Sequence, residues 1–172
     1  SVKALLYTEM IVAKALLYQN RKKLLDFDEI EHPVAIQLGG DDPLVLSEAA
    51  LIAESWGYDE INLNIGCPSQ KVQSGNFGAC LMKQPDLVAR CIEAMKRKTD
   101  LPITIKHRIG IDNLDSNEWL LAFVDQIAKA GADRFSIHAR KAWLNGLNPK
   151  QNRTIPPLEY KKVEYIKQKR PK

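Results

Sequence analysis

The sequence has few of the features that mark secreted, metal-binding or membrane proteins. It holds three cysteines and no Cys-x-x-Cys pair, which argues against a disulfide scaffold and against a zinc site. No apolar run approaches the ~18 residues of a membrane span, and the apolar N-terminal stretch is interrupted by Glu9 and Lys14. We therefore expect no metal, no membrane partner and no signal sequence, and a monomer in the reducing cytoplasm.

Compositional bias is also absent. With 9 Gly and 9 Pro in 172 residues, 45% hydrophobic and 27% charged, the chain has the composition of a folded globular protein rather than a disordered or collagen-like one. Its length fits one domain, but it is well short of the ~250 residues of a closed (β/α)8 barrel.

The net charge of +4 is unevenly distributed along the chain. Residues 141–172 contain nine basic and two acidic side chains, a net charge of +7, so residues 1–140 carry −3. Clustered Lys and Arg are typical of nucleic-acid-binding surfaces, which makes a polyanionic partner one explanation for this basic end. A solvated basic helix face is the other, and the charge count leaves both open.

Short β-type runs alternate with longer helical ones. Strands are expected at 34–38, 61–65, 103–107 and 134–138, with the end of one more strand around 7–9 followed by a helix to about Tyr18. Helices are expected at about 43–56, 85–96, 116–130 and 157–168, the third opened by a capping box of Asp115 and Glu118, with a long loop at 66–80.

Strands that alternate with helices indicate a parallel sheet. The expected strands are spaced by about 33 residues, the size of one β-α unit, so the chain holds about five units. Eight units at that spacing need about 265 residues. We predict an α/β fold, a (β/α)8 TIM barrel present as a partial barrel of about strands 2–6.

Polar side chains recur near the C-terminal ends of the expected strands, where buried parallel strands are normally apolar. They are Thr8, Glu9, Gln37, Asn62, Asn64, Thr104, Lys106, Ser136 and His138. Because the carboxyl ends of the strands form the mouth of a β/α barrel, we expect a site there. Taken singly, a residue such as His138 is more often a hydrogen-bonded core histidine than a catalytic group, and Gln37 alone fits the cap of a neighbouring loop. Lys106 differs, because a buried ammonium requires an anionic or electron-rich partner.

The most distinctive segment runs from Asn62, in the expected strand at 61–65, to Cys80. Cys67 lies on a Gly-Cys-Pro turn just past that strand, exposed to whatever occupies the mouth. Cys80 and Cys91 fall on apolar stretches and are expected in the core. The nearby glycines either let a ligand approach the backbone or are ordinary turn residues.

In these residues the sequence resembles a known family, the flavin-dependent tRNA-dihydrouridine synthases, most closely their A-type bacterial branch. The motifs are Tyr7-Thr-Glu-Met10, Ala35-Ile-Gln-Leu-Gly39, Asn62-Leu-Asn-Ile-Gly-Cys-Pro-Ser-Gln-Lys-Val-Gln73, Gly75-Asn-Phe-Gly-Ala-Cys-Leu81, Ile105-Lys-His-Arg-Ile-Gly110, Ser136-Ile-His-Ala-Arg140 and Asn152-Arg-Thr-Ile-Pro-Pro-Leu158. The resemblance covers essentially the whole chain, and its most specific part is the Asn-x-Gly-Cys-Pro segment.

The resemblance implies reduction of a uridine in the tRNA dihydrouridine loop to 5,6-dihydrouridine, with FMN in the barrel mouth and NADPH as the reductant. Enzymes of this family pass hydride from reduced flavin to the uracil ring while a cysteine thiol protonates the adjacent carbon. Cys67 matches that catalytic cysteine. A thiol is acidic enough for such a transfer near neutral pH, whereas a serine hydroxyl is not.

Binding roles follow from the same resemblance. The residues that match the family's FMN-binding positions are Gln37, Lys106 and His138. Lys106 would lie against the isoalloxazine, where a cation stabilises the anionic reduced flavin. The residues that match tRNA-binding positions are Asn64 at the target uridine and Lys150 and Arg153 in the basic end, with weaker support for Arg140 and Lys141. The uridine must leave its loop to stack on the flavin, which requires a pocket and a grip on the RNA backbone.

On this interpretation, residues 1–172 form part of an FMN-binding TIM-barrel catalytic domain. The family's first strand, last two strands and C-terminal helical domain are expected outside the sequence, together with the phosphate-binding loops that commonly follow strands 7 and 8. The alternative is a non-catalytic tRNA- or RNA-binding truncated homologue that cannot retain FMN. A flavin barrel acting on free pyrimidines ranks last, because it gives the basic end no purpose.

Overall fold

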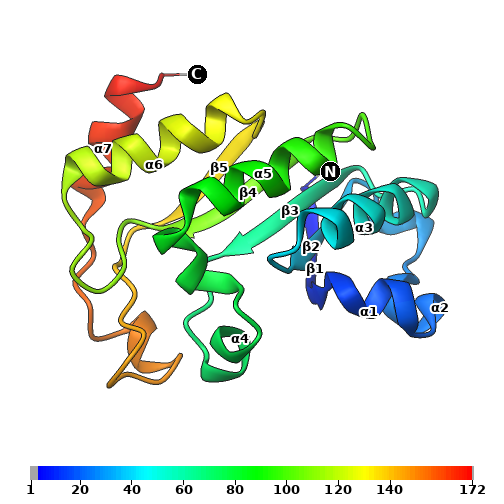
Figure 1. The fold of residues 1–172 in the computed structure, drawn as a ribbon, viewed down its shortest axis with the longest axis horizontal. Helices are drawn as coiled ribbons and strands as arrows, with labels where there is room; N and C mark the ends of the chain where they lie inside the picture. Colours follow the sequence, from blue (N-terminus) through cyan, green and yellow to red (C-terminus); the bar gives the residue numbers. More distant parts are fainter. Residues whose placement is uncertain (1–3, 172) are drawn as a thin grey trace.

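The computed structural model describes residues 4–171 and contains one five-stranded parallel sheet with helices on one face (Figure 1). The strands are β1 (Leu6–Val12), β2 (Val34–Gly39), β3 (Glu60–Ile65), β4 (Ile103–Arg108) and β5 (Arg134–His138). Their order across the sheet is their order along the chain, and β1 and β5 are its edges. The prediction of a partial barrel is therefore confirmed: the sheet is parallel and is not closed into a ring. Lys172, counted in the basic end, lies outside the described residues.

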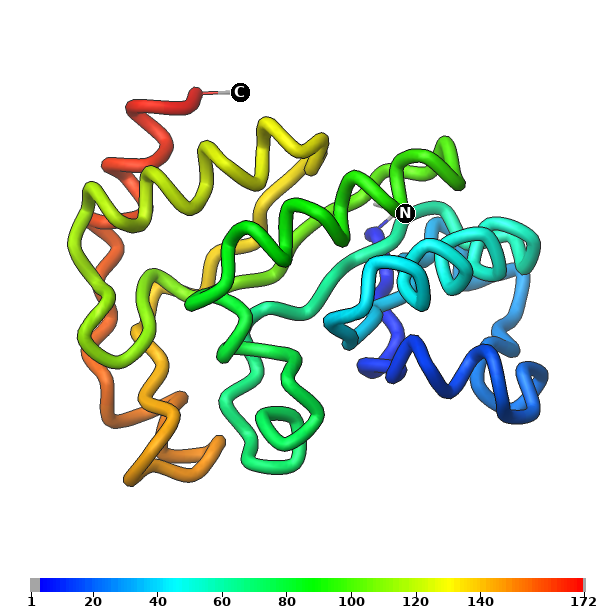
Figure 2. The backbone as a smooth tube through the Cα atoms, in the orientation of Figure 1, coloured from blue at the N-terminus to red at the C-terminus, as the bar shows by residue number. Residues whose placement is uncertain are grey.

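Helices cover the outer face of this sheet. The longer ones are α3 (Pro43–Ser55), α5 (Pro85–Lys96), α6 (Asn117–Lys129) and α7 (Tyr160–Lys169). The shorter elements are α1 (Ala13–Tyr18), α2 (Arg21–Leu25), α4 (Gln70–Ser74) and the 3-10 turns η1 (Glu29–Glu31), η2 (Gly78–Lys83) and η3 (Gln151–Arg153). The basic C-terminal helix α7 returns to lie beside α6 (Figure 2). We call the opposite face of the sheet the inner face.

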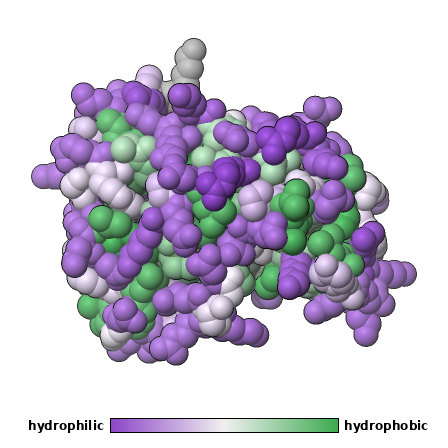
Figure 3. Space-filling model, viewed as in Figure 1, coloured by the Kyte–Doolittle hydropathy of each residue, from purple (hydrophilic) through white to green (hydrophobic). Residues whose placement is uncertain are grey.

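The apolar core lies between the sheet and the helices. Leu63 and Ile105 on the strands and Leu46 and Ile92 on the helices are fully buried within one cluster. Outside this core, the helix-covered side of the molecule presents a mostly hydrophilic surface with scattered apolar side chains (Figure 3). Among the described residues, none of the helices is long and apolar enough to cross a membrane.

Helix α3 shows why the sequence pattern worked. The carboxylate of Asp42 accepts hydrogen bonds from the backbone N–H groups of Leu44 at 2.8 Å and Val45 at 3.3 Å. Pro43 occupies the first turn, where its missing N–H costs nothing. Gly57 follows the helix with a φ of +84°, the left-handed conformation that ends many helices. The predicted start and stop of this helix are thus confirmed.

The predicted capping box of α6 was wrong. The cap is Ser116, whose hydroxyl accepts from Trp119 N–H at 3.1 Å. The Asp115 carboxylate is instead engaged by the ammonium of Lys141 at 2.7 Å. The Asp115 carboxylate therefore pairs with a cation that is distant in sequence instead of capping the backbone of α6.

Two segment boundaries also differ from the sequence expectation. The stretch 66–80, expected as a loop, contains the short helix α4, which begins where Ser69 accepts from Val72 N–H at 3.3 Å. The last helix begins at Tyr160 rather than near 157. The preceding residues stay extended because Glu159 N–H donates to the carbonyl of Ala139 at 2.9 Å.

Candidate active site at the carboxyl ends of the strands

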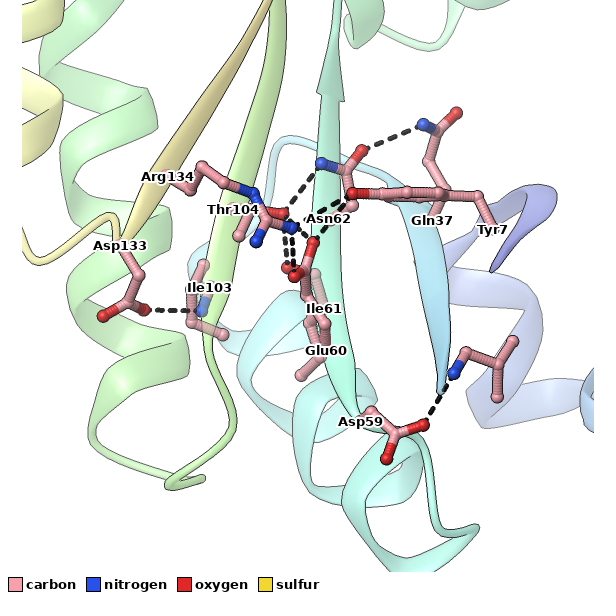
Figure 4. A network of polar contacts seen from close by, with 11 residues as sticks. Tyr7, Gln37, Asp59, Glu60, Ile61, Asn62, Ile103, Thr104, Asp133 and Arg134 are labelled. Atoms are coloured by element: carbon pink, nitrogen blue, oxygen red, sulfur yellow. Dashed lines mark hydrogen bonds and ion pairs between the residues drawn. The ribbon is translucent and has the colours of Figure 1, made fainter. Parts of the chain in front are cut away.

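Polar side chains of β2, β3 and β4 form a hydrogen-bonded row on the inner face (Figure 4). Gln37 Nε2 donates to Asn62 Oδ1 at 2.9 Å, and Asn62 Nδ2 donates to Thr104 Oγ1 at 2.9 Å. Asn64 extends the row toward the mouth, because its Nδ2 donates to Gln37 Oε1 at 2.9 Å. These polar side chains therefore lie on the same side of the sheet and contact one another directly.

At its lower end the row reaches Glu60, the first residue of β3. The Thr104 hydroxyl donates to Glu60 Oε1 at 2.6 Å, and the Tyr7 hydroxyl donates to the same oxygen at 3.2 Å. Arg134 forms an ion pair with the other carboxylate oxygen (Figure 4). Glu60 is only 4% exposed, so its charge depends on these partners. Glu60 and Arg134 were not predicted as part of the site, although each is a charged residue at the first position of a strand.

At its upper end the row supports the turn at residues 66–69, which we call the cysteine loop. Asn64 Oδ1 accepts from the backbone N–H groups of Gly66 at 3.1 Å and Cys67 at 3.0 Å. Cys67 is half-buried, and its Sγ lies 3.6 Å from Ser69 Oγ. The amide of Asn64 therefore fixes the backbone that carries the thiol.

Gly78 closes the cysteine loop from behind. Its φ is +74°, and a Cβ at this position would lie 2.6 Å from the carbonyl oxygen of Cys67 and 2.4 Å from Val72 Cγ1. The next residue, Ala79, donates its N–H to that same carbonyl at 2.8 Å. This glycine is therefore required for close packing of the chain on itself.

Arg108, at the end of β4, joins the cysteine loop to residues 139–156, which we call the basic loop. The side chain is buried, with Nε donating to the carbonyl of Gly66 at 3.1 Å and Nη1 donating to the carbonyl of Asn152 at 2.8 Å. Burial lowers the pKa of Arg108 to about 10. Arg108 was not predicted as a site residue, although it lies two residues after Lys106 in a strand-end motif.

The basic loop is folded around the side chain of Asn152, which is fully buried. Its Oδ1 accepts from Trp143 N–H at 2.8 Å, and its Nδ2 donates to the carbonyls of Trp143 at 2.9 Å and Leu147 at 3.2 Å. Lys150 and Arg153 flank this anchor and are both exposed. The loop is thus a rigid support that presents two cations to solvent.

A cleft of about 310 Å³ separates the basic loop from the cysteine loop and the start of α4. Its lining residues are Pro68, Ser69, Gln70, Leu144, Gly146, Leu147, Asn148 and Pro149. Gln73 Nε2 spans the two sides, donating to the carbonyls of Pro68 at 2.9 Å and Leu144 at 3.1 Å. The separation of the two loops is therefore fixed by direct hydrogen bonds as well as by Arg108.

Lys106 and His138 lie at the mouth on β4 and β5. The expectation of a buried Lys106 ammonium was wrong: the side chain is exposed, because the open sheet leaves this part of the inner face uncovered. Partial desolvation and the charge of Arg108 still lower the pKa of Lys106. For the half-buried His138, burial and then the charges of Arg108, Lys106, Arg140 and Arg153 lower the pKa to about 4. Its imidazole is therefore neutral at pH 7.

The residues singled out in the sequence fall into three groups. Gln37 and Asn64 touch each other, and Asn64 also binds the backbone of Cys67. Lys106 is the register neighbour of Asn64 across the β3–β4 pair, and His138 is that of Arg108 across β4–β5. Lys150 and Arg153 belong to the basic loop across the cleft, from where the charge of Arg153 still acts on His138.

Cys80 and Cys91 differ from Cys67. Cys91 is buried in the core as predicted, whereas Cys80 is half-buried, with Sγ 3.0 Å from the carbonyl of Phe77. Within residues 4–171, no group of three or more His, Cys, Asp or Glu side chains is placed to hold a metal ion. Cys67 is therefore the cysteine that the fold sets at the mouth.

Comparison with known proteins places the chain in a family. The family model described as dihydrouridine synthase matches residues 1–171. A tRNA-dihydrouridine(20/20a) synthase of Synechocystis sp. is 63% identical over 95% of this chain and 49% of its own length. Proteins of the same name are 55% identical in Xanthomonas axonopodis pv. citri and 57% identical in Haemophilus ducreyi, covering 98% and 97% of this chain and 50% and 51% of theirs.

The chain spans about half the length of the curated relatives it matches. A solved structure, the carboxyl transferase domain of Rhizobium etli pyruvate carboxylase, superimposes with a TM-score of 0.41 at 17% identity, covering 77% of this chain and 22% of that one, too weak a likeness to carry an argument. The family match and the curated relatives confirm the resemblance found in the motifs: the chain belongs to the dihydrouridine synthase family.

Proposed function

We propose that this chain carries the centre at which a uridine of tRNA is reduced to 5,6-dihydrouridine, in a cytoplasmic enzyme that uses FMN and NADPH. The observation that supports this most strongly is the link from the cysteine loop through Arg108 to the basic loop. It joins the loop that carries the thiol to the loop that carries the exposed cations Lys150 and Arg153. Such an arrangement suits a substrate whose reactive base is attached to a phosphate backbone.

Cys67 is the proton donor in this proposal. Reduction saturates one carbon–carbon double bond of uracil, so one ring carbon receives a hydride and its neighbour receives a proton. When bound, FMN supplies the hydride, with NADPH as the source of electrons. Cys67 gives its thiol proton to the second carbon, and the resulting thiolate regains a proton from solvent. The hydrogen bond from Cys67 N–H to Asn64 keeps the donor in place.

The mouth has side chains that fit a flavin ring. Gln37 has an Nε2 hydrogen to spare after its bond to Asn62. The exposed ammonium of Lys106 offers a positive charge from β4, and the neutral ring of His138 offers one donor and one acceptor. The positive charges of Lys106, Arg108, Arg140 and Arg153 around His138 favour an anionic ligand. We assign FMN binding to Gln37, Lys106 and His138.

The RNA would be held on both sides of the thiol. Asn64 lies one hydrogen bond from the cysteine loop, where it is placed to bind the target base. Lys150 and Arg153 would bind phosphates across the cleft. The cleft volume of about 310 Å³ is at the lower end of small-ligand pockets, which run from about 300 Å³ upward.

Substitution of the thiol tests the proposal. In a synthase that contains this chain, Cys67→Ala should reduce dihydrouridine formation by about 10²–10⁴-fold, the usual contribution of a general acid. Flavin reduction by NADPH and tRNA binding should persist, since Cys67 serves only the proton transfer. The matched control is Cys80→Ala, which removes a half-buried thiol outside the mouth. Full dihydrouridine formation in Cys67→Ala would refute the role of Cys67.

The colour of the protein separates this proposal from the RNA-binding alternative. A purified protein with a visible flavin absorption band supports the enzyme. A colourless protein that still binds tRNA, with an affinity that falls steeply as salt is added, supports the non-catalytic homologue.

A further inference from the structure

The hydrogen-bonded row on the inner face runs in one direction. We call Glu60, Thr104, Asn62, Gln37 and Asn64 the relay. Along it, each side chain donates to the next one down, from Asn64 at the mouth to the carboxylate of Glu60. All three amides are therefore oriented alike, with nitrogen toward Glu60 and oxygen toward the cysteine loop.

The two ends of the relay impose this direction. The Glu60 carboxylate, paired with Arg134, can only accept hydrogen bonds. The single hydrogen of Thr104 goes to Glu60, so Thr104 Oγ1 must accept from Asn62. At the other end, the backbone N–H groups that meet Asn64 can only donate. Reversing any one amide would therefore oppose two donors or two acceptors within the row.

This direction decides what the mouth offers to a ligand. Asn64 Oδ1 already accepts from Gly66 and Cys67, which uses both of its lone pairs. Its Nδ2 donates one hydrogen to Gln37 and keeps the other. Gln37 Nε2 likewise keeps one hydrogen after its bond to Asn62. Asn64 and Gln37 thus each keep one spare N–H donor, which complements a carbonyl oxygen.

We infer that Thr104 and Asn62 are positioning residues that hold Asn64 and Gln37 with spare N–H groups available to the mouth. Given the proposed function, the spare N–H of Gln37 serves the flavin and that of Asn64 meets the target base, which must then offer a carbonyl oxygen. Uracil offers one at two ring positions. Cytosine has an amine at one of them and would set a donor against a donor with Asn64 there. Selection for uracil would then depend on two residues that do not touch the base.

Removal of the Thr104 hydroxyl tests the inference in the chain itself. In Thr104→Val, Asn62 Nδ2 and Glu60 lose their shared partner, so the side-chain amide resonances of Gln37 and Asn64 should shift in ¹H–¹⁵N spectra. Hydrogen exchange at Cys67 N–H should accelerate by about tenfold, the equivalent of one weakened hydrogen bond. Thr104→Ser retains the hydroxyl and should restore both readouts.

A matched control removes a buried threonine hydroxyl elsewhere. Thr99 is 6% exposed, and its hydroxyl accepts from Leu101 N–H at 3.1 Å, outside the relay. Thr99→Val should leave the Gln37 and Asn64 signals unchanged. A folded Thr104→Val protein with unshifted amide signals and unchanged Cys67 exchange would overturn the inference.

A second variant probes the relay from the mouth, in case Thr104→Val does not fold. In Asn64→Asp, the carboxylate can still accept from Gly66 and Cys67, but it cannot donate to Gln37. Gln37 must then turn its amide over, and the side-chain signals of Asn62 should shift in response. Unshifted Asn62 signals in this variant would also overturn the inference.

The catalytic readout is separate. In a synthase that contains this chain, Thr104→Val should raise the KM for tRNA by about tenfold with a smaller change in kcat, and Thr104→Ser should reverse the effect. A general loss of fold would lower active protein without this split. If the spectra respond but the unsubstituted enzyme forms no dihydrouridine, the relay stands and the proposed function fails.

Discussion

The two ends of the inner face differ in how the positive charges of their side chains are balanced by carboxylates. At the lower end, the cation Arg134 meets the carboxylate of Glu60, and Tyr7 and Thr104 complete the set. At the mouth, four cations surround His138: Lys106, Arg108, Arg140 and Arg153. In the described part of the chain, none of these four forms an ion pair with a carboxylate.

This difference distinguishes an end that supports the fold from an end whose positive charges are unbalanced. The lower end satisfies its own charges and therefore stabilises the fold. The mouth concentrates like charges that repel one another until an anion binds, a cost that a purely structural role would not explain. Substitutions of the charged and titratable residues test this difference.

The largest effect concerns the two histidines on either side of the sheet. His107 is fully buried against Phe123 and Phe135, its Nε2 has no hydrogen-bond partner among residues 4–171, and burial lowers its pKa from 6.5 to about 4. Between pH 6.5 and about pH 4, His107 binds a proton in the unfolded chain but stays neutral in the folded chain. Stability should thus be full above pH 6.5 and fall by up to about 3 kcal/mol as the pH drops toward 4, measured by urea unfolding.

Substitutions assign this loss to the core or to the mouth. His107→Asn keeps an N–H near the carbonyl of Arg108 but does not titrate, so it should flatten the pH dependence. His138→Asn should flatten it less, because part of the lowering of the His138 pKa comes from the charges of Lys106 and Arg153, which are exposed and screened by solvent. A profile flattened by the His138 variant alone would reverse the comparison.

The next effect compares one cation from each end. Arg134→Met leaves the buried Glu60 carboxylate without its counter-charge and should lower the free energy of unfolding by about 2 kcal/mol, less than for a fully buried pair because Arg134 is half-exposed. Lys106→Met should change it by less than about 0.5 kcal/mol. Equal losses in urea unfolding would mean that the two ends do not differ.

The smallest effect concerns RNA binding by the basic loop. The double variant Lys150→Glu/Arg153→Glu should weaken tRNA binding by about tenfold and reduce the salt dependence, whose slope is about 0.9 per phosphate contact. The control reverses Lys167 and Lys169 on α7, which tests the solvated helix face. If the α7 variant loses as much affinity as the basic-loop variant, the basic loop is not the RNA-binding element.

The fold could be predicted because it depends on local patterns. Capping residues and buried strand cores lie close together in sequence, as around Asp42 and Gly57 in α3. The capping box failed because Lys141, which engages Asp115, approaches from 26 residues away along the chain. A long-range ion pair leaves no local pattern.

The site was predictable only in part, for the same reason. The sequence predicted polar side chains such as Gln37, Asn62 and Thr104 near the strand ends, but their hydrogen bonds depend on the register between strands, in which Asn62 stands opposite both others. Arg108 has its role because the basic loop returns to meet it, and that return depends on the buried amide of Asn152. Neither contact leaves a periodic signal in the sequence.

Gly78 gives the site a sensitivity that its chemistry alone would not reveal. A single methyl group at this position would press on the carbonyl oxygen of Cys67 and on Val72. In a saturation mutagenesis screen for activity, Gly78 should therefore score with the catalytic positions even though it has no functional group. A tolerance map of this chain would then trace the space that the cysteine loop needs as well as the atoms that react.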